Sequence, residues 1–137
     1  MRNTAFGIVV LAMSVLAVSV LTSCGSGGGD TAESISKEIV ANMKEMGTIL
    51  SGITDEASAK AAVPKIEAVR AKMRDAAKRA KTVPKIDAAT EQRIAETNQK
   101  DMAEAMQTIG AARERLMAQP ELVAIIEPAM QNMENDL

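Results

Sequence analysis

The methionines of this chain recur at helical spacing, and their thioether groups could support a specific chemistry. Eight of the ten methionines follow residue 24. Three pairs are separated by three or four residues, which places each pair on one helix face: Met43 with Met46, Met102 with Met106, and Met130 with Met133. Soft thioether sulfur suits Cu(I) or Ag(I), so the first two pairs could form a soft-metal or apolar-ligand site. We favour the simpler interpretation that these side chains fill gaps in an apolar core, since no histidine or cysteine accompanies them.

A second pattern is the positive charge of residues 60–85, which include nine basic and two acidic side chains. Such a segment could bind anionic lipid headgroups, lipopolysaccharide phosphate or an acidic envelope protein. The candidate interaction face consists of Lys65, Lys72, Arg74 and Arg79. We favour neutralisation within the fold, because residues 30–56 carry a net charge of −4. The net charge of −3 from residue 24 onward argues against nucleic acid as a partner.

The chain lacks several of the residue types on which enzymes commonly rely for catalysis. The chain has no histidine, its only aromatic residue is Phe6 and its only cysteine is Cys24. Histidine is the usual general base and the commonest transition-metal ligand. Catalysis would depend on Asp, Glu, Lys, Ser and Thr, and no motif assembles them. We therefore predict that the protein is not an enzyme and has no cofactor apart from a covalent lipid on Cys24.

The lipid prediction comes from the amino-terminal segment. Arg2 precedes an apolar stretch from Phe6 to Val20, which is too short for a confident membrane span. Directly after it, Leu21-Thr22-Ser23-Cys24 resembles the lipobox of bacterial lipoproteins. The resemblance implies a diacylglyceryl group on Cys24, cleavage before it and N-acylation of the new terminus. Several acyl chains together would anchor the protein to a membrane.

The residues after Cys24 refine this expected location. In Gram-negative bacteria, aspartate directly after the lipidated cysteine is the main signal for inner-membrane retention, so Gly25 favours the outer membrane. The glycine-rich run from Gly25 to Asp30 is typical of a flexible tether. We predict a signal peptide at 1–23, a lipidated cysteine and linker at 24–33, and one domain at 34–137. The domain would face the periplasm or the cell surface.

The domain has the periodicity of helices. Apolar residues recur at three and four positions from Ile35 to Ile53. Ser34 is the expected cap of this first helix, and Gly52 its stop. Thr54 is expected to cap a second helix that kinks or breaks near residues 62–63, before Pro64. The predicted inner face of a third helix consists of Ile94, Asn98, Met102, Ala105, Ile109, Ala112 and Leu116, behind a cap at Asp87.

A fourth helix is expected to start at Pro120, because proline suits the first turn. The predicted fold is all-α: an antiparallel three-helix bundle with a short fourth carboxyl-terminal helix, behind a signal-peptide helix and a glycine-rich tether. Residues 55–66 also resemble a segment of small uncharacterised helical envelope proteins, which implies no activity. We expect a lipid-anchored interaction or structural module of the cell envelope, and an exposed apolar stripe would allow self-association into a homo-oligomer.

Overall fold

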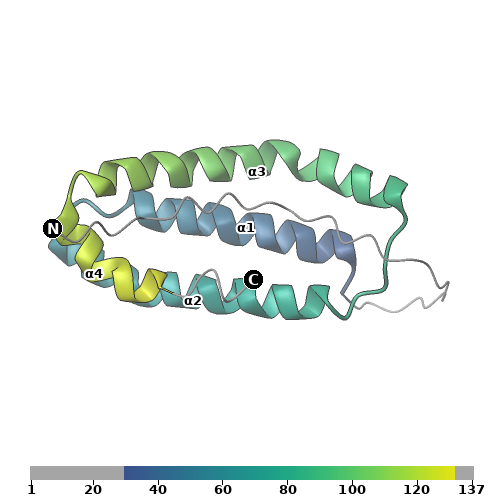
Figure 1. Ribbon diagram of the computed structural model, residues 1–137, viewed down its shortest axis with the longest axis horizontal. Coiled ribbons are helices and arrows are strands. Elements are labelled where there is room, and N and C mark those ends of the chain that lie inside the picture. The colour runs from purple at the N-terminus through teal and green to yellow at the C-terminus, as the bar shows by residue number, and fades with distance from the viewer. Residues whose placement is uncertain (1–29, 132–137) are drawn as a thin grey trace, which may run out of the picture.

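The computed structural model describes residues 30–131, and this part of the chain is all-α, without a strand. Its helices are α1 (Ala32–Ser51), α2 (Glu56–Ala80), α3 (Ala88–Met117) and α4 (Pro120–Met130). The three longer helices lie side by side, and α4 covers part of α2 (Figure 1). The predicted signal peptide, Cys24 and most of the predicted tether lie outside the described residues.

Short polar residues begin the three longer helices. Thr31 caps α1 in a reciprocal pair with Ser34: each side chain accepts a hydrogen bond from the other residue's backbone N–H. Asp55 and Ser58 repeat this arrangement at α2. The predicted caps at Ser34 and Thr54 were therefore wrong, because in each case the residue three positions before a serine begins the helix. The predicted cap at Asp87 is confirmed.

Proline acts differently at its several positions. Pro120 occupies the first turn of α4, as predicted, where its missing N–H costs no helical hydrogen bond. Pro64 lies inside α2, which continues without a break from Glu56 to Ala80. Of the kink or break predicted near residues 62–63, the break is therefore absent. Ala62 and Ile66 on either side of Pro64 are buried, so core packing on both sides holds the helix across the one missing bond.

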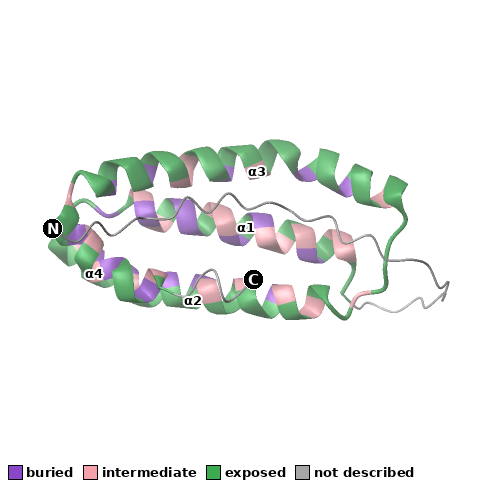
Figure 2. Cartoon of the chain, in the orientation of Figure 1, coloured by how far each residue is buried: buried purple, intermediate pink, exposed green. Residues whose placement is uncertain are grey.

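The core is built around α1, which packs against both α2 and α3. The main hydrophobic cluster draws on all four helices and lies towards the end at which α1 finishes: Met46, Leu50, Ile53, Ala59, Ala62, Ile66, Val69, Ala112, Leu116, Leu122, Ile126 and Ala129. Buried positions run along the facing sides of the helices, whereas the outer side of α3 is exposed (Figure 2). Of the predicted α3 inner face, all but Met102 and Ile109 are buried, and those two are half-buried.

α1 and α3 approach each other closely at a glycine of α1. A Cβ atom placed on Gly47 would lie 3.1 Å from Cγ2 of Thr108 and 3.4 Å from Cγ1 of Ile109. Gly110, which directly follows Ile109 in α3, has open space where its Cβ would be. Gly47 therefore sets how closely the two helices pack, whereas Gly110 only costs helix propensity.

We expect Gly110→Ala to raise the free energy of unfolding by about 0.5–1 kcal/mol, because alanine favours a helix interior. Gly47→Leu should lower it by about 1–3 kcal/mol, because the larger side chain overfills the contact with α3. Urea denaturation followed by circular dichroism would measure both. Stabilisation by Gly47→Leu would contradict the close packing of α1 on α3.

Candidate interaction surface

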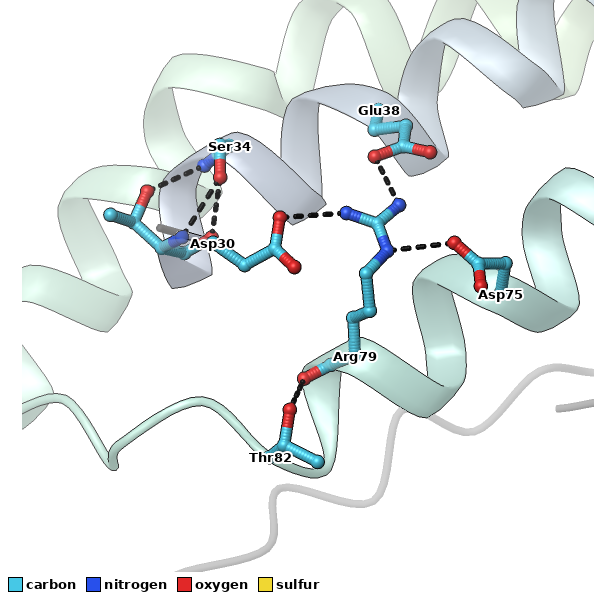
Figure 3. Close-up of polar contacts among 7 residues, drawn as sticks. Asp30, Ser34, Glu38, Asp75, Arg79 and Thr82 are labelled. Atoms are coloured by element: carbon cyan, nitrogen blue, oxygen red, sulfur yellow. Dashed lines mark hydrogen bonds and ion pairs between the residues drawn. The ribbon is translucent and has the colours of Figure 1, made fainter. Parts of the chain in front are cut away.

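Arg79 of the candidate interaction face is bound by three carboxylates (Figure 3). Its Nη1 donates to Oδ1 of Asp30 at 2.8 Å, its Nη2 to Oε2 of Glu38 at 2.5 Å, and its Nε to Oδ2 of Asp75 at 2.8 Å. The hydrogen bonds to Glu38, Asp75 and Asp30, in that order, raise the pKa of the guanidinium above its ordinary value. Arg79 thus joins α2 to α1 and to Asp30, two residues before α1 begins. Its positive charge is neutralised by these carboxylates.

Other ion pairs hold α1 on its two flanks. Lys72 of α2 binds Glu45 of α1 at 2.8 Å between Nζ and Oε2. On the opposite flank, Nζ of Lys44 lies 3.0 Å from Oδ1 of Asp101 and 3.4 Å from Oε2 of Glu104, both on α3. The hydrogen bond to Asp101 is the largest cause of the raised pKa of Lys44. Acidic side chains of α1 therefore face basic ones of α2, and a basic side chain of α1 faces acidic ones of α3.

The four predicted residues do not share one face of α2. Lys65, Lys72 and Arg79 follow one another at seven-residue intervals, so they lie along one side of the helix. Arg74 lies nearly opposite Lys72, because it follows Lys72 by two positions, a rotation of about 200° around the helix. Lys65 is exposed and has no ion pair within residues 30–131. Of the four predicted residues, Lys72 and Arg79 are therefore paired within the fold, whereas Lys65 is not.

The predicted methionine site is divided between different environments. Met46 is buried in the core cluster, with 3% of its surface exposed, and Met106 on α3 is 58% exposed. Met43 and Met102 are half-buried. Met46 therefore packs as a core residue, and the four thioethers do not form one enclosed site. No group of three or more Asp and Glu side chains within residues 30–131 is arranged to hold a metal ion.

Two polar contacts between α1 and α3 were not predicted. Nδ2 of Asn98 donates to Oγ of Ser36 at 2.9 Å, which satisfies an amide that is 7% exposed. At the other end, Nη2 of Arg115 donates to the carbonyl oxygens of Leu50, Ser51 and Ile53 at 2.9–3.1 Å. Leu50 and Ser51 are the last two residues of α1, where carbonyl oxygens lack the next turn of the helix as a partner, and Ile53 lies just beyond. The polar position of Asn98 was visible in the sequence, but its partner was not.

The remaining buried amide belongs to Asn42. It lies between Glu38 and Glu45, whose side chains bind α2, so Asn42 belongs to the α2 side of α1. Its buried Nδ2 has no hydrogen-bond partner among the described residues, which costs folding free energy. The apolar periodicity of α1 gave no sign of a buried polar residue here.

Comparison with known protein families, curated proteins and solved structures found no match to this chain. None of the helices within residues 30–131 is long and apolar enough to cross a membrane. The lipobox of residues 21–24 lies outside the described residues, so lipidation of Cys24 stays a prediction.

We expect Arg79→Met to destabilise the fold, because it leaves the carboxylates of Asp30, Glu38 and Asp75 without their shared cation. Lys65→Met removes the same charge from an exposed position of the same helix and should change the free energy of unfolding by about 0.5 kcal/mol or less. Urea denaturation midpoints of the two variants would be compared. Equal midpoints would contradict a structural role for Arg79.

Proposed function

We propose that this chain is a lipid-anchored helical module of a bacterial cell envelope that acts by contact, without catalysis. The observation that carries the proposal is the sequence Leu21-Thr22-Ser23-Cys24 directly after an apolar stretch. The start of the domain agrees with it, because the first helix is capped at Thr31, just after the glycine-rich residues 25–29. The membrane would hold the lipid, and the helices would be presented to an envelope partner.

The proposed architecture is an antiparallel three-helix bundle closed by α4. Contacts between α1 and α2 run in opposite orders along the two helices: Glu38 binds Arg79, and Glu45 binds Lys72. Contacts between α1 and α3 run in the same order, from Ser36 with Asn98 to Leu50 with Arg115. An up-down-up arrangement accounts for both sets of contacts.

The contact role is supported by the difference between side chains that join helices and side chains that stay exposed. The ion pairs and Arg115, described above, join helices. The large apolar side chains that remain exposed include Met106 and Met117, both on α3. They are separated by eleven residues, which places them on one side of that helix. The surface available to an envelope protein therefore includes this side of α3 and Lys65 on α2. No observation within residues 30–131 favours soft-metal binding over this role.

Cys24→Ser should abolish incorporation of labelled palmitate and leave an unprocessed chain, because serine lacks the thiol that accepts the diacylglyceryl group. Ser26→Ala, two residues further on, is the matched control and should be labelled as the natural sequence is. Metabolic labelling followed by membrane fractionation in bacterial cells measures both. A processed, membrane-bound Cys24→Ser chain would refute the anchor.

A photoreactive side chain at Lys65 or Met117 should give a discrete crosslinked product with another envelope protein in intact cells. Both positions are exposed, so the substitution leaves the core unchanged. The same probes in Cys24→Ser should lose that product, because the chain is no longer held at the membrane. If illumination gives no crosslink to another protein at either position, the contact role is contradicted.

A further inference from the structure

One end of the molecule combines the start of α1 with the loop between α2 and α3. Asp30, the first described residue, is bound to Arg79 in the last turn of α2. The first turn of α1, the last turn of α2 and the first turn of α3 lie together at this end (Figure 1). Whatever precedes Asp30 therefore enters the fold beside the loop of residues 81–87.

This end carries lysines that the fold does not use. Lys78, Lys81 and Lys85 are exposed and have no ion pair or side-chain hydrogen bond within residues 30–131. Acids lie at this end as well: Asp30 and Asp75 bind Arg79, Glu33 binds Lys37, Asp87 caps α3 by accepting from the backbone N–H of Thr90, and Glu91 lies in the first turn of α3. We call Lys78, Lys81, Lys85 and Ile86 the basic end.

The basic end also exposes an apolar side chain. Ile86 is 36% exposed and is one of three large exposed hydrophobic residues in the described part of the chain. It follows Lys85 directly, in a loop between two helices. An aliphatic side chain beside lysines matches the boundary between phosphate headgroups and acyl chains.

Compensation of the helix dipole explains only part of this pattern. Lys78 and Arg79 lie in the last turn of α2, where positive charge stabilises a helix. Lys85 and Ile86 lie beyond the helix, where the dipole no longer acts. The helix dipole therefore does not account for the positions of Lys85 and Ile86.

The length of the predicted tether brings this end close to a membrane. Six residue steps separate Cys24 from Asp30, and an extended chain spans at most about 3.5 Å per step, or roughly 20 Å. The far end of α3 lies a further ~45 Å away, given 30 residues at about 1.5 Å each. A lipid on Cys24 therefore holds the basic end within about 20 Å of the headgroups, whereas the tether alone does not determine how far away the opposite end lies.

We propose that the basic end docks on anionic phospholipid headgroups of the membrane that carries the anchor, so that the bundle stands with its α2–α3 loop on the bilayer. The inference rests on the proposed lipidation of Cys24. The lysines bind the headgroup phosphates, and Ile86 enters the interface. The net negative charge of the whole chain opposes other orientations on an anionic surface.

The test uses the full lipidated chain in vesicles, with a fluorophore on a cysteine introduced at either end of α3. Ala89→Cys lies beside the loop and Ala118→Cys at the far end, and both positions are exposed. Energy transfer to acceptor-labelled headgroups should be strong from residue 89 and weak from residue 118 in phosphatidylglycerol-containing vesicles. In pure phosphatidylcholine this difference should shrink.

Charge-matched variants identify the surface. Lys81→Gln with Lys85→Gln should reduce the docked fraction relative to the undocked fraction by about fivefold for each lysine removed. Lys65→Gln with Lys100→Gln removes the same charge from exposed lysines elsewhere and should leave the transfer unchanged. Circular dichroism would confirm that both variants stay helical. Equal transfer from residues 89 and 118, or no effect of the first pair, overturns the proposal.

The same samples distinguish failure of the proposed orientation from failure of the proposed lipid anchor. With Cys24 lipidated, the introduced cysteine is the only free thiol, so one fluorophore is incorporated per chain. Two fluorophores per chain and no retention by vesicles would refute lipidation, and the orientation proposal with it. One fluorophore with equal transfer from both ends would refute the orientation alone.

Discussion

The fold depends on one constraint: α1 has to be covered by α2 on one flank and by α3 on the other. Its buried residues therefore spread beyond the single stripe of Ile35, Met46 and Leu50 to include Val40 and Gly47. The glycine lets α3 approach closely, while the ion pairs on either flank distinguish the two neighbours by charge. Exchanging α2 and α3 would separate Glu45 from Lys72 and Lys44 from Asp101, so these pairs favour the observed arrangement, whereas the pair of Glu33 with Arg93 of α3 has the opposite sense.

Arginine side chains bind backbone carbonyl oxygens at the ends of neighbouring helices. Arg115 binds the carbonyl oxygens that end α1, and Nη1 of Arg70 donates to the carbonyl oxygen of Ala129 near the end of α4. Each arginine comes from a different helix than the one it caps, so the end of one helix is fixed only when another is in place. Arg79 of α2 likewise joins a second helix, because it binds the carboxylates of Asp30 and Glu38 at the start of α1. Basic residues that looked available in the sequence are therefore partly structural.

The helical part of the fold could be predicted because it follows from local rules. The three-and-four spacing of apolar residues located four helices, and Asp87, Gly52 and Pro120 marked ends that the structure has. Two caps were misplaced by one and three residues: Asp55 directly follows the predicted cap Thr54, and Thr31 pairs with Ser34, which was itself the predicted cap. The partners of Arg79 could not be predicted, because Glu38 and Asp30 are 41 and 49 positions away in the chain. Periodicity states which residues face inward, whereas these contacts depend on how helices are placed beside one another. The lipid on Cys24 stays a prediction from a motif outside the described residues.

The central position of α1 also determines when the domain can fold. This helix is synthesised first, but an isolated helix of 20 residues is marginal in water, and both of its flanks are buried only by later parts of the chain. Thr108 and Arg115, which contact it, emerge about 60 residues after their partners. Leu122 and Ile126 of the core cluster come later still. During synthesis, the complete core can therefore form only after nearly the whole domain has left the ribosome.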